Sequence, residues 1–81
     1  MIVYLSTKAD RQLRKLPKKM HQLLIDRIRM LDQQPFPSQS KKLVDRLGWR
    51  FRVVDYRILY TVCKKSVTVL SVAHRREAYR F

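Results

Sequence analysis

The last third of the chain gathers side chains that could carry out chemistry on a phosphodiester. Arg50, Arg52 and Arg57 lie in a stretch of alternating polar and apolar residues, and the segment HRREAYR follows at residues 74–80. Cleavage of RNA by its own 2′-hydroxyl needs a base, an acid and cations that stabilise charge on the transition state. Arginine stays charged and offers phosphate two parallel hydrogen bonds. These residue types therefore indicate an RNA-cleaving site.

Two residues of the final segment are candidate proton carriers. His74 is the conventional one, because an unperturbed imidazole titrates near neutrality. Tyr79 lies among arginines, and neighbouring positive charge favours a phenolate that could act as a base. Arg75 and Arg76 add cations at the end of the last strand. The segment thus supplies both proton-transfer groups and charge.

The net charge points to a polyanionic partner. Nineteen Lys and Arg stand against six Asp and Glu, which gives a net charge of +13 on 81 residues. Such an excess costs stability through self-repulsion and is typical of proteins that bind nucleic acid. The chain shows no long amphipathic helix with bulky apolar anchors, so a membrane is not an expected partner. An acidic protein could be a second partner.

Cofactor chemistry is not expected. Cys63 is the single cysteine, and the scattered Asp residues form no carboxylate cluster for magnesium or zinc. We therefore predict no metal and no small-molecule cofactor. The N-terminal MIVYLSTKAD lacks the pattern of a secretion signal, and with the lone cysteine this predicts a cytoplasmic protein.

The first half of the chain reads as a strand and two helices. Residues 1–5 are apolar and partly β-branched, and Ser6 or Thr7 can cap a helix that carries Ala9 and Leu13 on one face. Pro17 ends that helix and suits the start of a second one, whose apolar stripe continues to Leu31. The segment PFPS at residues 35–38 ends the hairpin and opens a loop with two lysines, Lys41 and Lys42.

From residue 49 the apolar period becomes two, which predicts three strands joined by tight turns at residues 54–55 and 64–65. This register sets Arg52 opposite Arg57 and puts His74 on the face of Arg57, opposite Asp55. Arginines directly across from each other are destabilising without an anion between them. The same strands turn four apolar side chains toward the core: Trp49, Phe51, Ile58 and Tyr60.

The predicted fold class is α+β: an N-terminal strand, then an α-helical hairpin packed on one face of a small antiparallel sheet, in a single domain of residues 1–81. The turn at residues 54–55 is the weak point, because Val54 would be strained at a position that needs positive φ. Either the turn is of another type or the hairpin tip has shifted, and the pairing of Arg52 with Arg57 would shift with it.

The segments WRFRV, DYRILY and HRREAY resemble RelE, a toxin of the RelE/ParE type II toxin–antitoxin superfamily, and the resemblance extends over nearly the whole chain. It implies a ribosome-dependent endonuclease that cuts mRNA in the ribosomal A site without a metal. It also implies a cognate antitoxin that neutralises the toxin. The implied partners are thus that antitoxin and mRNA on the ribosome, with its ribosomal RNA.

The resemblance also implies roles for individual residues. Arg57 matches a phosphate-binding arginine, and Arg75 matches an arginine proposed to stabilise the transition state or act as general acid. Tyr79 matches the terminal tyrosine, proposed to orient the substrate base or transfer a proton. His74 is common in the family but is not required by every member. Further phosphate or RNA contacts are expected from five residues: Arg50, Arg52, Arg76, Lys41 and Lys42.

Two other functions remain open from the sequence. A toxin like those of the ParE branch would share the fold and inhibit DNA gyrase without a nuclease site. The HRREAY segment argues against this alternative, because that branch generally lacks the nuclease residues. A basic RNA-binding module would bind with steep salt dependence and yield no product with a 2′,3′-cyclic phosphate end.

Overall fold

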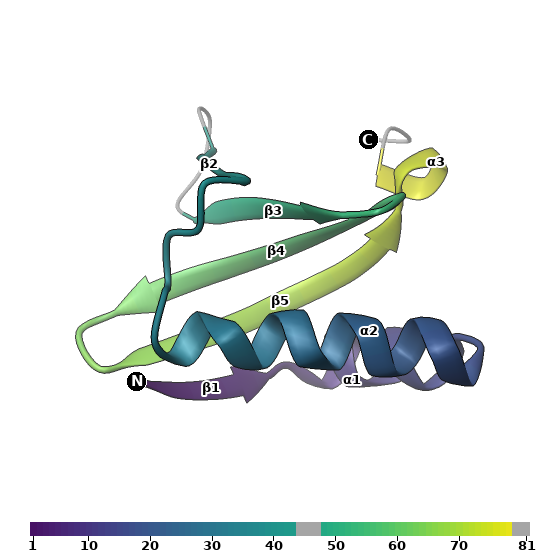
Figure 1. Cartoon of the computed structure of the whole chain (residues 1–81), viewed down its shortest axis with the longest axis horizontal. Coiled ribbons are helices and arrows are strands. Elements are labelled where there is room, and N and C mark those ends of the chain that lie inside the picture. The colour runs from purple at the N-terminus through teal and green to yellow at the C-terminus, as the bar shows by residue number, and fades with distance from the viewer. Residues whose placement is uncertain (44–47, 79–81) are drawn as a thin grey trace.

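The computed structural model describes residues 1–43 and 48–78 of the chain. Four segments carry helical structure: α1 (Thr7–Arg14), α2 (Lys18–Arg29), the 3-10 turn η1 (Met30–Asp32) and α3 (Arg75–Ala78) (Figure 1). The strands are β1 (Ile2–Leu5), β2 (Ser40–Lys42), β3 (Trp49–Val53), β4 (Tyr56–Cys63) and β5 (Ser66–His74). None of the helices within the described residues is long and apolar enough to cross a membrane.

The strands form one five-stranded sheet in the order β1-β5-β4-β3-β2. The α+β fold class is confirmed, with two differences in the sheet. β1 pairs with β5 in parallel, so the sheet is mixed, and the loop expected around Lys41 contains the short strand β2. Both differences concern strand pairing at the edges of the sheet. The spacing of apolar residues within one segment does not show which other segment it pairs with.

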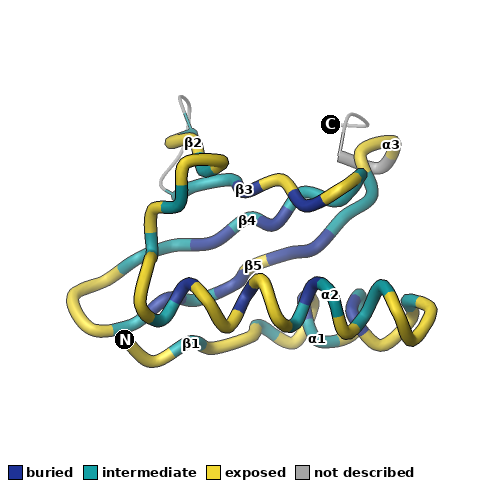
Figure 2. The backbone as a smooth tube through the Cα atoms, in the orientation of Figure 1, coloured by how far each residue is buried: buried dark blue, intermediate teal, exposed yellow. Residues whose placement is uncertain are grey.

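The core lies between the helical hairpin and one face of the sheet (Figure 2). Ser6 caps α1 by accepting a hydrogen bond from the Ala9 N–H at 3.0 Å, and Ala9 and Leu13 then bury on one side of that helix. The sheet contributes alternating side chains, including Phe51, Val53, Ile58, Tyr60, Val67 and Val69. Because side chains alternate along a strand, the residues between these positions face away from the helices.

A β-bulge interrupts β5. Leu59 pairs with Ser71 while Tyr60 pairs with Val69, so Leu70 is an extra residue without a partner in β4. Two side chains, from the N-cap and the last turn of α1, satisfy the groups that the bulge exposes. The Ser6 hydroxyl donates to the Leu70 carbonyl at 2.8 Å, and the Val72 N–H donates to the Gln12 side-chain oxygen at 2.6 Å. The bulge is therefore held by side chains of a different element.

The bulge overturns the predicted place of His74. An uninterrupted ladder would set His74 opposite Asp55 on the face of Arg57. The extra residue shifts the second half of β5 by one position, so that His74 pairs with Tyr56 and Ala73 pairs with Arg57. A shift of one residue reverses the face of each following side chain. His74 therefore lies on the opposite face of the sheet from Arg57.

Replacing Gln12 tests the support of the bulge. Val72 is only 3% exposed, so Gln12→Leu leaves its N–H without an acceptor in a dry environment. We expect a loss of about 1–3 kcal/mol in the free energy of unfolding, measured by urea denaturation. Gln12→Glu is the matched control, because a carboxylate still accepts the bond. Equal stability of the two variants would contradict the assigned role.

The turn between β3 and β4 keeps its predicted tip at the cost of an unusual backbone conformation. Val53 pairs with Tyr56, which leaves Val54 and Asp55 as the turn residues. Val54 has φ of 55°, in the left-handed region that β-branched residues rarely adopt. The hairpin tip has not shifted, and Arg52 pairs with Arg57 as predicted.

A Val54→Gly variant is expected to be more stable than the wild-type protein. Left-handed backbone costs a residue with a Cβ about 1–2 kcal/mol, and glycine avoids this cost but loses more conformational entropy on folding. Val54 as a whole residue is 57% exposed, so little burial is lost. We expect a net gain of about 1 kcal/mol in thermal or urea unfolding. Val54→Ala keeps the Cβ, and an equal gain from alanine would show that the conformation is not the cause.

Candidate functional site

Four cations lie on the face of the sheet that points away from the helices. Lys41 of β2 pairs with Arg50 of β3, and Arg52 of β3 pairs with Arg57 of β4. Side chains directly opposite each other in a ladder share a face, with Cβ atoms about 4.5–5.5 Å apart. We call this group of four residues the cationic face: Lys41, Arg50, Arg52 and Arg57.

A cavity of about 410 Å³ opens on the cationic face. All four cations line it, together with Gln39, Phe51 and Val54. Five of these seven described residues have side chains that donate hydrogen bonds, and none of the seven is acidic. Like charges opposed across a ladder are destabilising on their own, and an anion placed between them removes this penalty. A phosphate group has the charge and the hydrogen-bonding geometry for such a site.

The turn at Val54 and Asp55 connects the cationic face to the end of β5. The Arg52 Nε donates to the Val54 carbonyl at 3.2 Å, and the Arg75 backbone N–H donates to the Asp55 carbonyl at 2.7 Å. Neighbouring carbonyls of a single turn thus hold the Arg52 side chain and the first residue of α3. The exposed Arg75 therefore begins α3 next to the turn between β3 and β4 (Figure 1), the turn that also holds Arg52 of the cationic face.

The other predicted site residues are placed differently. Lys42 pairs with Trp49, on the face opposite Lys41, so the structure does not bring it to the cationic face. Arg76 is exposed in α3, one residue beyond Arg75. Tyr79 lies outside the described residues. Of the two predicted loop lysines, only Lys41 therefore lies on the same face as Arg50, Arg52 and Arg57.

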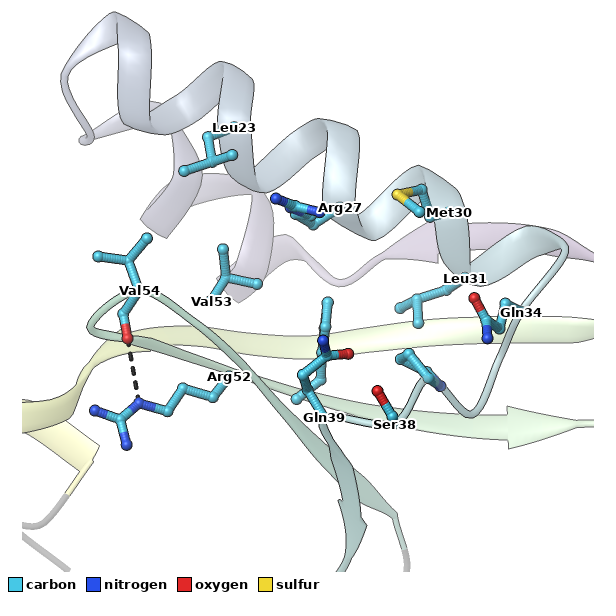
Figure 3. A pocket seen from close by; sticks show the side chains of 12 residues that line it. Leu23, Arg27, Met30, Leu31, Gln34, Ser38, Gln39, Arg52, Val53 and Val54 are labelled. Atoms are coloured by element: carbon cyan, nitrogen blue, oxygen red, sulfur yellow. Dashed lines mark hydrogen bonds between the residues drawn. The ribbon is translucent and has the colours of Figure 1, made fainter.

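A second cavity, of about 390 Å³, lies between α2 and the end of β3 (Figure 3). Arg27 and Met30 line its helical side, and Val53 and Val54 line its strand side. The two cavities share four lining residues: Gln39, Phe51, Arg52 and Val54. Gln39 and Arg27 are not among the site residues that the sequence predicts. The only signal for Gln39 was its position two residues before Lys41.

The strand that carries Lys41 is tied to the core by Tyr60. The buried Tyr60 hydroxyl donates to the Pro35 carbonyl at 2.8 Å, and the Ser40 hydroxyl donates to the Pro37 carbonyl at 2.7 Å. Burial raises the pKa of the Tyr60 phenol above its ordinary value of 10.0, against a smaller opposing effect of a hydrogen bond with Ser40. The phenol therefore stays protonated at neutral pH and can keep donating.

Within residues 1–43 and 48–78, no three His, Cys, Asp or Glu side chains lie together where they could hold a metal ion. The residues that line the cationic face are cations and hydrogen-bond donors, which can bind an anion and stabilise charge that develops on it.

The sequence model of the ParE toxin of the type II toxin–antitoxin system parDE matches residues 3–79. The chain therefore belongs to the ParE toxin family, within the RelE/ParE superfamily of type II toxins. No curated protein matches the sequence.

Solved structures of this superfamily share the fold over almost the full chain. The RelBE2 toxin–antitoxin complex from Mycobacterium tuberculosis contains a chain that is 28% identical, with a TM-score of 0.81 over 91% of this chain and 96% of that one. The intact Escherichia coli RelBE complex matches with 22% identity and a TM-score of 0.77, covering 90% of this chain and 94% of that chain.

A YoeB/ParE toxin from Agrobacterium tumefaciens is 17% identical, with a TM-score of 0.76 over 91% of this chain and 98% of that one. Because the E. coli and A. tumefaciens proteins are only 22% and 17% identical to this chain, their similarity establishes the fold alone. The activity has to be argued from the residues of the site.

Proposed function

We propose that the protein is a ribosome-dependent mRNA endonuclease that cleaves mRNA in the ribosomal A site by metal-independent attack of the 2′-hydroxyl. The observation that carries this proposal is the cationic face with Arg75 beside it. Four cations line one cavity. The turn of Val54 and Asp55 accepts hydrogen bonds both from the Arg52 side chain and from the Arg75 backbone N–H at the start of α3. That the reaction takes place on the ribosome, and therefore in the cytoplasm, is inferred from the resemblance to RelE.

Each cation has a role that follows from its position. Arg57 and Arg52 are opposite each other in the ladder and bind the scissile phosphate between them. Lys41 and Arg50 lie closer to the β2 edge of the sheet, and they bind the phosphate next to the scissile one. Arg75 stabilises the negative charge that develops during attack, which is where preorganised donors have their largest effect.

The proton-transfer roles rest on the resemblance. Tyr79 orients the substrate base or transfers a proton in the proposed reaction. Arg50 and Arg52 do not act as general bases, because the guanidinium group does not readily lose a proton. Arg76 and Lys42 contribute to RNA binding from outside the cationic face.

We further propose a cognate antitoxin with acidic segments that cover the cationic face or the helical hairpin. The solved M. tuberculosis and E. coli relatives are toxin–antitoxin complexes. A net charge of +13 favours an acidic partner. Co-expression of a neighbouring small reading frame should restore growth and copurify with the toxin. If such a product neither binds nor restores growth, this part of the proposal fails.

A gyrase inhibitor is the second candidate, and the match of residues 3–79 to the ParE toxin model favours it. The two functions separate in a pair of assays with the same protein preparation. Purified protein is incubated with programmed ribosomes and the mRNA ends are mapped, and in parallel with DNA gyrase in a supercoiling assay. New ends in the A-site codon with unchanged supercoiling support the nuclease. Inhibited supercoiling without new ends supports the alternative.

A further inference from the structure

His74 makes two contacts at the junction of β5 and α3. Its ring packs edge-on against Tyr56, with the ring centroids 5.3 Å apart and the planes at 88°. Its Nδ1 accepts a hydrogen bond from the Arg76 N–H at 3.3 Å. The second contact resembles an N-cap, in which a side chain accepts a bond from an N–H in the first turn of a helix.

These contacts lie on the side of the sheet away from the cationic face. Arg57 pairs with Ala73, so Ala73 is the β5 residue whose side chain shares a face with Arg57. His74 follows it in the strand and points to the other side, where it meets Tyr56. A proton carrier must come within hydrogen-bond reach of the reacting atoms, about 2.6–3.2 Å. The placement of His74 does not favour that task.

The backbone at the junction has a complementary contact. The Arg75 N–H donates to the Asp55 carbonyl at 2.7 Å, and the next N–H of the chain, that of Arg76, donates to His74. The Asp55 carbonyl and the His74 imidazole thus accept hydrogen bonds from the first two N–H groups of α3, which have no partners inside that helix. Together they set where Arg75 begins relative to the cationic face.

We infer that His74 is a positioning residue of the proposed cleavage reaction: it caps α3 and anchors it on Tyr56, and so holds Arg75 in place. The inference rests on the proposed nuclease function. It assigns to His74 an acceptor role at Nδ1, which a protonated imidazole cannot fill because both of its nitrogens donate. The β5 bulge makes this possible, because it turns His74 toward Tyr56.

Three substitutions separate the two roles. His74→Asn keeps a short side-chain acceptor that caps helices well and cannot exchange a proton near neutral pH. His74→Phe keeps the ring against Tyr56 and loses the acceptor. His74→Ala loses both contacts. Single-turnover cleavage of mRNA on programmed ribosomes is measured for each, alongside thermal unfolding to correct for the folded fraction.

If His74 positions α3, the asparagine variant cleaves within about threefold of the wild-type rate and the alanine variant loses about five- to tenfold, the size of a lost cap. The phenylalanine variant falls between them. If His74 carries the proton, all three variants lose about 100-fold or more, because general acid–base catalysis contributes at least that much. Such a common loss would overturn the inference.

Amide hydrogen exchange at Arg76 tests the cap without reference to activity. Exchange should be faster in His74→Ala and His74→Phe than in the wild type, and close to the wild-type rate in His74→Asn. Equal exchange in all four proteins would overturn the inference even if cleavage is observed. If wild-type protein cleaves no mRNA but shows this exchange pattern, the proposed function fails and the capping role of His74 stands.

Discussion

An Arg57→Ala variant is expected to lose mRNA cleavage on programmed ribosomes by about 100-fold or more. Arg57 lies on β4, the central strand of the sheet, opposite Arg52, and lines the cavity of the cationic face. Removal of one preorganised donor from a site where negative charge develops costs about two to three orders of magnitude in rate. Arg75→Ala should cause a loss of the same order, because in the proposed reaction both cations act on the same phosphate.

Arg14 supplies the matched control for these substitutions. It is an arginine of α1 with a 75% exposed side chain, and its ion pair with Asp10 spans 3.1 Å on the surface. Exposed pairs of this kind contribute at most about 1 kcal/mol, so Arg14→Ala removes the same charge at little cost in stability. Its cleavage rate should stay near that of the wild type. Equal cleavage by Arg57→Ala and Arg14→Ala would contradict the assignment of the site.

The second large effect is expected in RNA binding. A variant with Lys41, Arg50 and Arg52 all changed to alanine should bind single-stranded RNA with a flatter salt dependence. Each neutralised phosphate contributes about 0.7 to the slope of log K against log salt, so three lost contacts reduce the slope by about 2. The affinity at low salt should fall by more than tenfold. Fluorescence anisotropy over a salt series measures both quantities.

Three lysines of the helices supply the control: Lys8, Lys18 and Lys19, all exposed. Their triple alanine variant has the same change in net charge, but α1 and α2 cover the opposite face of the sheet. If binding depended on net charge alone, both triple variants would lose the same slope. That result would argue against a defined phosphate site on the cationic face.

The local pattern of the sequence was enough to predict the central hairpin. Alternation from Trp49 onward places Phe51 and Ile58 in the core, and the two-residue turn then sets Arg52 opposite Arg57. These features depend on neighbours in the chain, and a hairpin register follows from its turn length. The strain expected at Val54 is present as a φ of 55°.

Contacts between distant segments could not be read in the same way. The parallel pairing of β1 with β5 joins Val3 to Val67, and the bulge at Leu70 is held by Ser6 and Gln12 of another element. A bulge leaves no period of its own in a sequence, yet it reverses the face of the residues that follow it. This is why His74 was assigned to the wrong face while Arg57 was assigned to the right one.

In the proposed reaction, the 2′-hydroxyl of the mRNA is the nucleophile. The most direct test is cleavage of an mRNA with a single 2′-deoxynucleotide at the mapped position in the A-site codon, compared on programmed ribosomes with the unmodified message. If the 2′-hydroxyl is the nucleophile, the unmodified message yields a 2′,3′-cyclic phosphate end and the modified bond is not cut. Cleavage at the 2′-deoxy position at an undiminished rate would contradict it.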